Sequence, residues 1–246
     1  MKKKSSFLIV LFSGAFVILI YGCNGGKVAE QVQSPELNIS LSSDSKEVTI
    51  GKQVWMTENL DVSKFRNGDP IPEAKTNEEW IKAGENKQPA WYYPLENNNG
   101  LKYGKLYNWY AVIDPRGLAP EGWHIPKKEE WEALLQFFGE EVSGEKLKSS
   151  IEWSNIGHTE GEFYRHFRKG TNESNFSALP GGERYSTGEF TGYFNYGYWW
   201  SDTKNENEIN ANPNQVWIFF LEFSSDWGTL ENGNIGNGYS VRCLKN

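Results

Sequence analysis

The stretch that decides the fold is Glu121-Gly122-Trp123-His124-Ile125-Pro126, which runs directly into residues 127–138. Within 127–138 the apolar side chains recur at the i, i+3, i+4 and i+7 spacing of one helix face, and they are Trp131, Leu134, Leu135 and Phe138. Gly139 follows at a position where helices commonly end. The pattern predicts one long helix packed by its apolar face against a sheet, so we assign it to the core and not to chemistry.

Composition indicates short strands and tight turns around that helix. The chain of 246 residues holds 11 Trp, 12 Tyr and 14 Phe beside 25 Gly, which is typical of strand-rich proteins and not of helical bundles. From residue 175 onward, strand patterns, one of them over residues 215–223, alternate with Gly and Asn turns. We therefore expect a fold of helices and strands whose second half is rich in β-structure. Its regular structure should begin at Glu47 with a hairpin, because two short strand patterns, 47–50 and 53–56, flank a turn at Gly51-Lys52.

The N-terminus has the pattern of a bacterial lipoprotein signal peptide. Three lysines precede an apolar run over residues 7–20, and Gly22 stands immediately before Cys23. The run is shorter than the ~20 residues that a membrane-spanning helix needs. We expect residues 1–22 to be removed, Cys23 to carry acyl chains such as palmitate, and residues 23–46 to form a flexible tether. An uncleaved anchor and an ordinary secretory signal are the alternatives.

The net charge and the cysteine content bear on nucleic-acid binding and on disulfide formation. Removal of the leader, with its three lysines and no acidic residue, takes the formal net charge from −7 to −10. The remaining chain has no cluster of Lys and Arg that could neutralise phosphates, so we expect no nucleic-acid partner. With Cys23 acylated, only Cys243 is left and no intrachain disulfide can form. Its alternating surroundings predict a buried, inert thiol.

Six stretches carry a more specific signal, among them Gly-Tyr-Trp-Trp-Ser at 197–201 and Ser-Val-Arg-Cys at 240–243. The others are residues 53–60, 103–112, 117–126 and 172–182. Together they resemble the Fibrobacter succinogenes major paralogous domain family, found in exported proteins and lipoproteins of that bacterium and of Bacteroidetes. The resemblance implies a single α+β domain over residues 47–246, C-type-lectin-like, with short helices packed on twisted antiparallel sheets and long irregular loops.

The chain departs from the family pattern at three positions. Relatives often have Cys where this chain has Ala119, and that Cys would pair with the terminal Cys. They usually have Ser or Thr at the position of Lys127, whose side chain cannot accept the hydrogen bond of a helix N-cap. A Gly commonly stands where this chain has Asn175, which tolerates a left-handed turn nearly as well.

Catalytic chemistry has little support in the sequence. The family is similar to the formylglycine-generating enzyme, whose activity would need a paired-cysteine centre, and the mature domain has a single cysteine. His124, His158 and His166 are too scattered for metal-ligand spacing. We interpret His124 as a core histidine with one satisfied nitrogen. We therefore expect no enzymatic activity.

Aromatic residues in the second half are the candidate ligand contacts. We expect some of their rings to form a flat platform for glycan or protein, and the candidates are Tyr196, Tyr198, Trp199, Trp200, Trp217 and Trp227. Neighbours on a regular strand face opposite sides, so Trp199 and Trp200 should not both be buried. Oxygen-bearing side chains near this platform are weak calcium candidates by their likeness to the ligands of C-type lectins, namely Asn212, Asn214 and Asp226. No other cofactor is implied.

These observations lead to one expected function. We expect a protein that is lipid-anchored in the bacterial cell envelope, at the outer membrane, and that acts as a non-catalytic binding or adhesion module for glycan or for an envelope protein. The alternatives are a structural envelope or fimbria-associated subunit and an enzyme on the formylglycine-generating scaffold.

Overall fold

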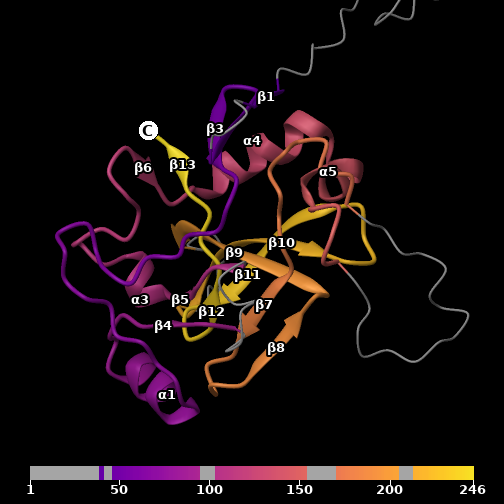
Figure 1. Ribbon diagram of the computed structural model, residues 1–246. Helices are drawn as coiled ribbons and strands as arrows, with labels where there is room; N and C mark the ends of the chain where they lie inside the picture. Colours follow the sequence, from indigo (N-terminus) through magenta and orange to yellow (C-terminus); the bar gives the residue numbers. More distant parts are fainter. Residues whose placement is uncertain (1–38, 42–45, 95–102, 154–169, 205–212) are drawn as a thin grey trace, which may run out of the picture. The chain divides into compact units, whose positions relative to one another are not determined.

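The computed structural model describes residues 39–41, 46–94, 103–153, 170–204 and 213–246 (Figure 1). The predictions for the signal peptide, for Cys23, for Asn212 and for His158 and His166 lie outside these residues, as does most of the predicted tether. The described part is a single α+β domain of short helices and two sheets, which confirms the predicted fold class.

The long helix predicted from the opening stretch is α4 (Lys128–Phe138), and its four periodic apolar residues are all buried. Its first turn is capped without a side-chain acceptor at Lys127. The Lys127 amide donates to Glu130 Oε2 at 2.8 Å, and the Lys128 amide donates to Thr203 Oγ1 at 3.0 Å. Gly139, with φ of 83°, ends the helix, and α5 (Glu140–Leu147) follows at once.

Two shorter helices begin at side-chain caps. Thr76 caps α1 (Asn77–Glu85) by accepting from the Glu79 amide, and the Glu79 carboxylate accepts from the Thr76 amide in return. Thr76 and Glu79 thereby form a complete capping box. Asn108 caps α3 (Trp109–Val112) by a single bond, in which its Oδ1 accepts from the Ala111 amide at 3.1 Å.

The smaller sheet joins the two ends of the domain. Its strand order is β1 (Ile39–Leu41), β2 (Glu47–Ile50), β3 (Gln53–Met56), β13 (Leu244–Lys245) and β6 (Trp123–His124). The predicted opening hairpin is confirmed as β2 and β3, with Gly51 at φ of 61° in the turn. β1 lies within the range assigned to the tether and pairs with β2. The C-terminal strand β13 lies between β3 and β6 and pairs with both. The last residues are therefore hydrogen-bonded to the hairpin that opens the domain.

The larger sheet carries most of the second half of the chain. Its order is β11 (Gly228–Asn234), β10 (Gln215–Glu222), β9 (Tyr196–Lys204), β7 (Gly181–Arg184), β12 (Gly238–Tyr239), β5 (Leu106–Asn108) and β4 (Trp91–Tyr92), with β8 (Phe190–Tyr193) paired to β7. The expectation of purely antiparallel sheets was wrong at one pairing, because β7 and β9 run parallel. The chain reverses direction between β7 and β8 and again between β8 and β9, so β9 runs in the same direction as β7.

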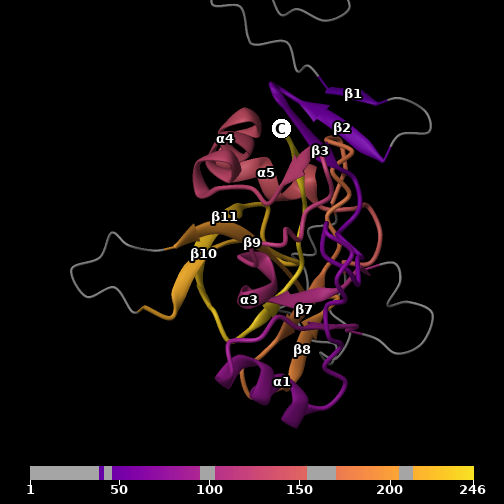
Figure 2. The same ribbon diagram turned by 90° about the vertical axis from the view of Figure 1, so that its left-hand side faces the viewer.

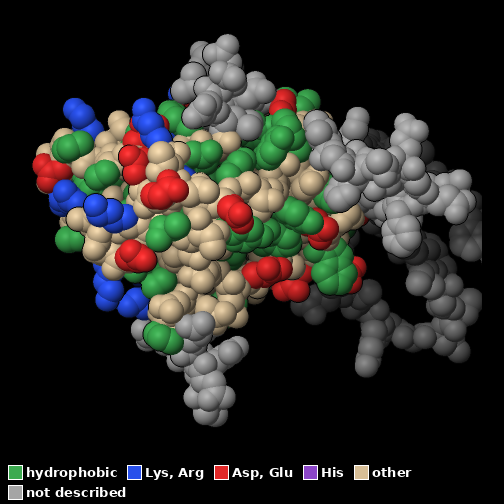
Figure 3. Space-filling view, turned by 90° about the horizontal axis from the view of Figure 1, so that it is seen from below, with side chains coloured by type: hydrophobic (Ala, Val, Ile, Leu, Met, Phe, Trp, Pro, Cys, Tyr) green, Lys and Arg blue, Asp and Glu red, His purple; other side chains and the backbone are tan. Residues whose placement is uncertain are grey.

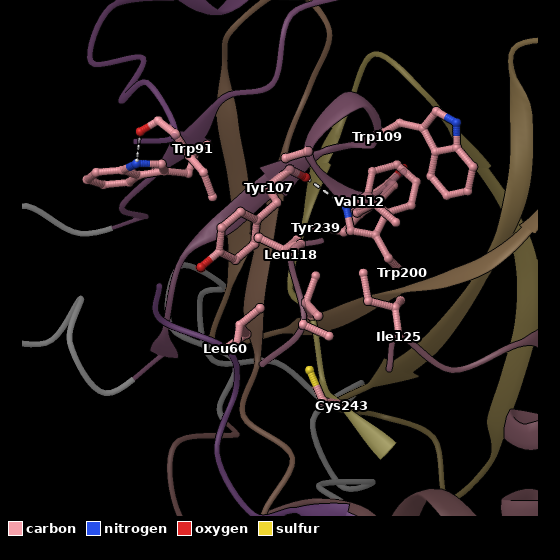
Figure 4. Packing of buried hydrophobic residues seen from close by; sticks show 14 of the residues in the cluster. Leu60, Trp91, Tyr107, Trp109, Val112, Leu118, Ile125, Trp200, Tyr239 and Cys243 are labelled. Carbon is pink, nitrogen blue, oxygen red and sulfur yellow. Dashed lines mark hydrogen bonds between the residues drawn. The ribbon is translucent and has the colours of Figure 1, made fainter. Parts of the chain in front are cut away.

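Strand β9 runs between two hydrophobic clusters. Trp200 belongs to the cluster shown in Figure 4, where its indole N–H donates to the Tyr107 carbonyl at 2.7 Å. Trp199 belongs to the other cluster, together with Trp131 of α4. Helices α4 and α5 lie beside β10 and β11 in both views (Figures 1 and 2). The expectation that one of the two rings is exposed was wrong, because both faces of β9 are covered and both rings are fully buried.

Buried cations satisfy the carbonyl groups of the irregular segments. Arg184 donates to the carbonyls of Gly188, Ala74 and Thr76. Lys148 donates to the Ser225 carbonyl at 2.6 Å. Because an unpaired buried carbonyl is costly, these side chains take the place of sheet hydrogen bonds where the backbone is not regular. Within the described residues, no helix combines the length and apolar character needed to cross a membrane.

Candidate functional site

The structure separates the six aromatic residues that were predicted to form one platform. Trp199 and Trp200 are core residues. Trp227 is 56% exposed and lies where the β10–β11 turn enters β11. Trp217 is half-buried, and the Lys128 ammonium group stands 4.4 Å from its ring centre. Only Tyr196 and Tyr198 are brought together.

Tyr196 and Tyr198 form a partly exposed aromatic surface with Phe220, which we call the aromatic shelf. The two tyrosines are two residues apart on β9 and therefore share a face, and Phe220 of β10 is the cross-strand partner of Tyr198. The ring centres are 4.9 Å apart for Tyr198 and Phe220, 5.9 Å for Tyr196 and Phe220, and 6.2 Å for the two tyrosines. All three side chains are half-buried, so the shelf presents rings that are already fixed by one another.

A carboxylate lies at the inner edge of the aromatic shelf. Glu183 of β7 is only 8% exposed, and its Oε2 accepts from Asn237 Nδ2 at 3.1 Å. The hydroxyl groups of Tyr198 and Tyr239 are also hydrogen-bonded to it. Burial raises the pKa of Glu183, and these three hydrogen bonds partly oppose the rise. The side chain is therefore held in place by neutral donors alone.

The surroundings of Glu183 are acidic and aromatic. Glu222 is the cross-strand partner of Tyr196, and Glu231 is the partner of Ile218, two residues from Phe220 on the same face. Tyr185 is 41% exposed, and the charge of Glu183 is the main cause that raises its pKa. Figure 3 shows that basic side chains gather toward one edge of the molecule when it is seen from below.

Sequence reasoning missed Glu183, Phe220, Asn237 and Tyr239. Phe220 carried a usable signal, because residues 215–223 were recognised as a strand and its position two residues from Ile218 fixes its face. Glu183 follows two glycines and gave no pattern of its own. Its place beside Tyr198 depends on the parallel pairing of β7 with β9, which local sequence does not indicate.

The calcium candidates are not brought together. Asn214 precedes β10 and Asp226 follows it, so the eight residues of that strand, roughly 24 Å in extended form, separate them. Asn214 and Asp226 thus lie at opposite ends of β10, while Asn212 lies outside the described residues. Among the residues that the structure does describe, no group of three or more His, Cys, Asp or Glu side chains could hold a metal ion.

His124 differs from its sequence-based interpretation. The ring is about one-third exposed, and both nitrogens have partners: Nδ1 lies 2.8 Å from Asn246 Oδ1, and Nε2 lies 3.0 Å from the Glu130 carboxylate. The interpretation as a core histidine with one satisfied nitrogen was wrong, because β6 is an edge strand and leaves the ring partly accessible. Its contacts tie the C-terminus to the first turn of α4.

A separate cleft of about 460 Å³ lies beside the smaller sheet. Its wall includes Trp123, Met56 and Asn59 together with the Lys46–Glu58 ion pair, whose atoms are 3.1 Å apart. The Asn59 amide is fully used by core contacts. The other charged groups of its wall are also paired, Lys46 with Glu58, Glu47 with Lys245 and Asp61 with Lys105, so this cleft offers fewer free polar groups to a ligand than the aromatic shelf does.

The thiol of Cys243 is not part of either surface. It is fully buried in the cluster of Figure 4, and burial raises its pKa to about 12. The expected buried thiol is thereby confirmed, and its high pKa gives little thiolate for nucleophilic chemistry.

Comparison with known proteins gives one match. A sequence model of one protein family, described as the Fibrobacter succinogenes major domain, matches residues 48–245. No curated protein and no solved structure matches the chain.

Proposed function

This chain belongs to the Fibrobacter succinogenes major domain family, and from that premise we propose that it is a lipid-anchored, non-catalytic module of the bacterial cell envelope that binds glycan on the aromatic shelf. One observation carries the proposal. Three rings that fix one another, Tyr196, Tyr198 and Phe220, stand half-exposed beside hydrogen-bonding groups on a rigid sheet.

The chemistry of the shelf suits a sugar better than an apolar ligand. Aromatic faces attract the C–H face of a pyranose ring, and a tyrosine adds a polar group at the edge of each ring. The hydroxyl of the half-buried Tyr198 is hydrogen-bonded to Glu183, so the lone pairs of its oxygen are left as acceptors for sugar hydroxyls. A preformed aromatic surface with a few oriented polar groups is typical of small-ligand sites.

The family's expected likeness to C-type lectins agrees with a binding role, and the leader pattern supports an envelope location. Acylation at Cys23 is tested by metabolic labelling with a palmitate analogue. We expect Cys23→Ala to abolish the label on this protein. Unchanged labelling of the variant would argue against the lipid anchor and would leave glycan binding as a separate question.

The binding role is tested with a glycan array probed by the full chain. The protein is kept in a polyoxyethylene detergent, whose headgroup contains neither sugar nor charge, and is probed with and without calcium. We expect glycan hits that disappear in Tyr196→Ala, because this change removes one ring of the shelf at a half-exposed site.

The matched control is Tyr110→Ala, which removes a half-buried tyrosine of α3 that is not part of the shelf. This variant should keep the hits of the unmodified protein. Absence of hits in both calcium conditions, or equal loss in the two variants, would contradict glycan binding on the shelf.

A further inference from the structure

Glu183 is unusual among the buried charges of the described residues. It is the one buried acidic side chain there, and the others are cations: Lys105, Lys148, Arg184 and Arg242. None of the salt bridges found within the described residues includes Glu183. A buried carboxylate without a cationic partner is costly, so its presence next to an exposed surface points to a ligand that supplies the positive charge.

The neighbouring groups increase the preference for a cation. The face of an aromatic ring is negative, and Tyr198 stands between Glu183 and the rest of the shelf. The further carboxylates of Glu222 and Glu231 occupy the same sheet face. Nearby rings, one fixed carboxylate and an acidic rim form the type of environment in which organic ammonium groups bind.

We propose that the aromatic shelf selects glycans that carry a free amino group, with the sugar ring on Tyr196, Tyr198 and Phe220 and its ammonium group directed toward Glu183. This inference rests on the proposed glycan-binding function and names the substrate class. An amino sugar has an apolar C–H face, which suits the aromatic rings, and a positive charge, which suits the Glu183 carboxylate. Acetylation of the amine removes the charge and keeps the ring, which provides a matched pair of ligands.

The test compares oligomers of glucosamine and of N-acetylglucosamine of the same length. Calorimetric titrations use the full chain in the same detergent, slightly below neutral pH, where the amines are protonated. We expect the glucosamine oligomer to bind at least about tenfold more tightly, since only it forms the charge-assisted contact. Glu183→Gln should remove this difference in affinity between the two oligomers.

A control variant and a second measurement separate recognition from folding. Glu121→Gln removes an exposed carboxylate that belongs to neither the aromatic shelf nor its rim, and this variant should keep the preference within about twofold. Near-ultraviolet circular dichroism checks that Glu183→Gln is folded. If the variant is not folded, the salt dependence of binding to the unmodified protein tests the charge-assisted contact instead. Added salt should lower the affinity for the glucosamine oligomer and not the affinity for the N-acetylated oligomer.

The possible failures are distinguishable. Equal affinity for the two oligomers, or a preference that persists in folded Glu183→Gln, would overturn the amino-sugar inference and leave glycan binding intact. If neither oligomer binds and the glycan array is also empty, the proposed function itself fails.

Discussion

Arg242 and Asn59, which are 183 residues apart in the chain, are joined in the core by two hydrogen bonds: Nε and Nη2 of the arginine donate to Oδ1 of the asparagine at 3.0 and 2.7 Å. The same oxygen accepts from Trp199 Nε1 at 2.8 Å. Arg242 also donates through Nη1 to the carbonyls of Met56 and Phe176. One fully buried guanidinium group therefore joins the first strands, the 172–182 segment and the C-terminus.

Asn59→Ala should destabilise the domain by roughly 3 kcal/mol or more, because it leaves a buried charge and the Trp199 indole without their shared acceptor. Urea unfolding followed by tryptophan fluorescence measures the change. Asn67→Ala is the matched control, since its amide is exposed and bonds only within its own turn at Asp69. It should cost about 0.5 kcal/mol or less. A cost for Asn59→Ala as small as that of the control would refute this role.

Lys127→Ser should stabilise the domain by about 1 kcal/mol, because a serine at the N-cap can accept from the amides of the first turn of α4. The backbone of Lys127 already has the extended conformation of a cap, with φ of −77° and ψ of 164°. Thermal unfolding of both proteins measures the difference. Lys127→Ala is the control, because it also removes the charge but supplies no acceptor. A melting temperature equal in the serine and alanine variants would show that capping is not the cause.

The sequence predicted the elements that local patterns determine. The periodic face of α4, the hairpin of β2 and β3 and the buried Cys243 all follow from spacing and turn residues. The burial of both Trp199 and Trp200 could not be predicted in this way. Alternation fixes which face of β9 each ring occupies, but whether that face is covered depends on segments distant in the chain, such as α4 on one side and Tyr107 on the other.

The candidate site was predicted only in its aromatic part. Tyr196 and Tyr198 were recognised as ligand candidates, while Trp217 and Trp227 are placed elsewhere by their own strand and turn. Glu183 reaches the shelf through a pairing between parallel strands whose partners are fifteen residues apart, Gly182 with Gly197. Such pairing is set by the three-dimensional fold, since neither strand carries a local signal for its partner.

Ala119→Cys should restore the disulfide that the family resemblance implies with Cys243. Both residues lie in the same buried cluster, and the closed loop is long, so the gain is expected at about 2–4 kcal/mol. Thiol titration of the unfolded protein and non-reducing mass spectrometry detect the bond. If the cysteine introduced at position 119 and Cys243 both remain free thiols in the oxidised, folded variant, the two side chains do not meet. Cys23 is counted separately in this titration. Ala119→Ser is the control for the change in size and polarity.

Glu183→Gln should raise the melting temperature relative to the unmodified protein more at neutral pH than in acid. Burial raises the pKa of Glu183 in the folded state, so the folded state binds a proton more tightly than the unfolded state does. The stabilisation from this proton is present below the ordinary glutamate pKa and is lost as the pH rises through the higher folded-state value. Glutamine is neutral at every pH, so the Glu183→Gln variant does not lose this stabilisation as the pH rises.

The measurement is the difference in melting temperature between Glu183→Gln and the unmodified chain across that range of pH. Glu231→Gln serves as the control, because it removes an exposed carboxylate and changes the formal charge by the same amount. A flat difference for Glu183→Gln would mean that its carboxylate is not penalised by burial. A positive slope would show that the fold tolerates an unpaired carboxylate at a cost, as expected where a charge is kept for a ligand and not for stability.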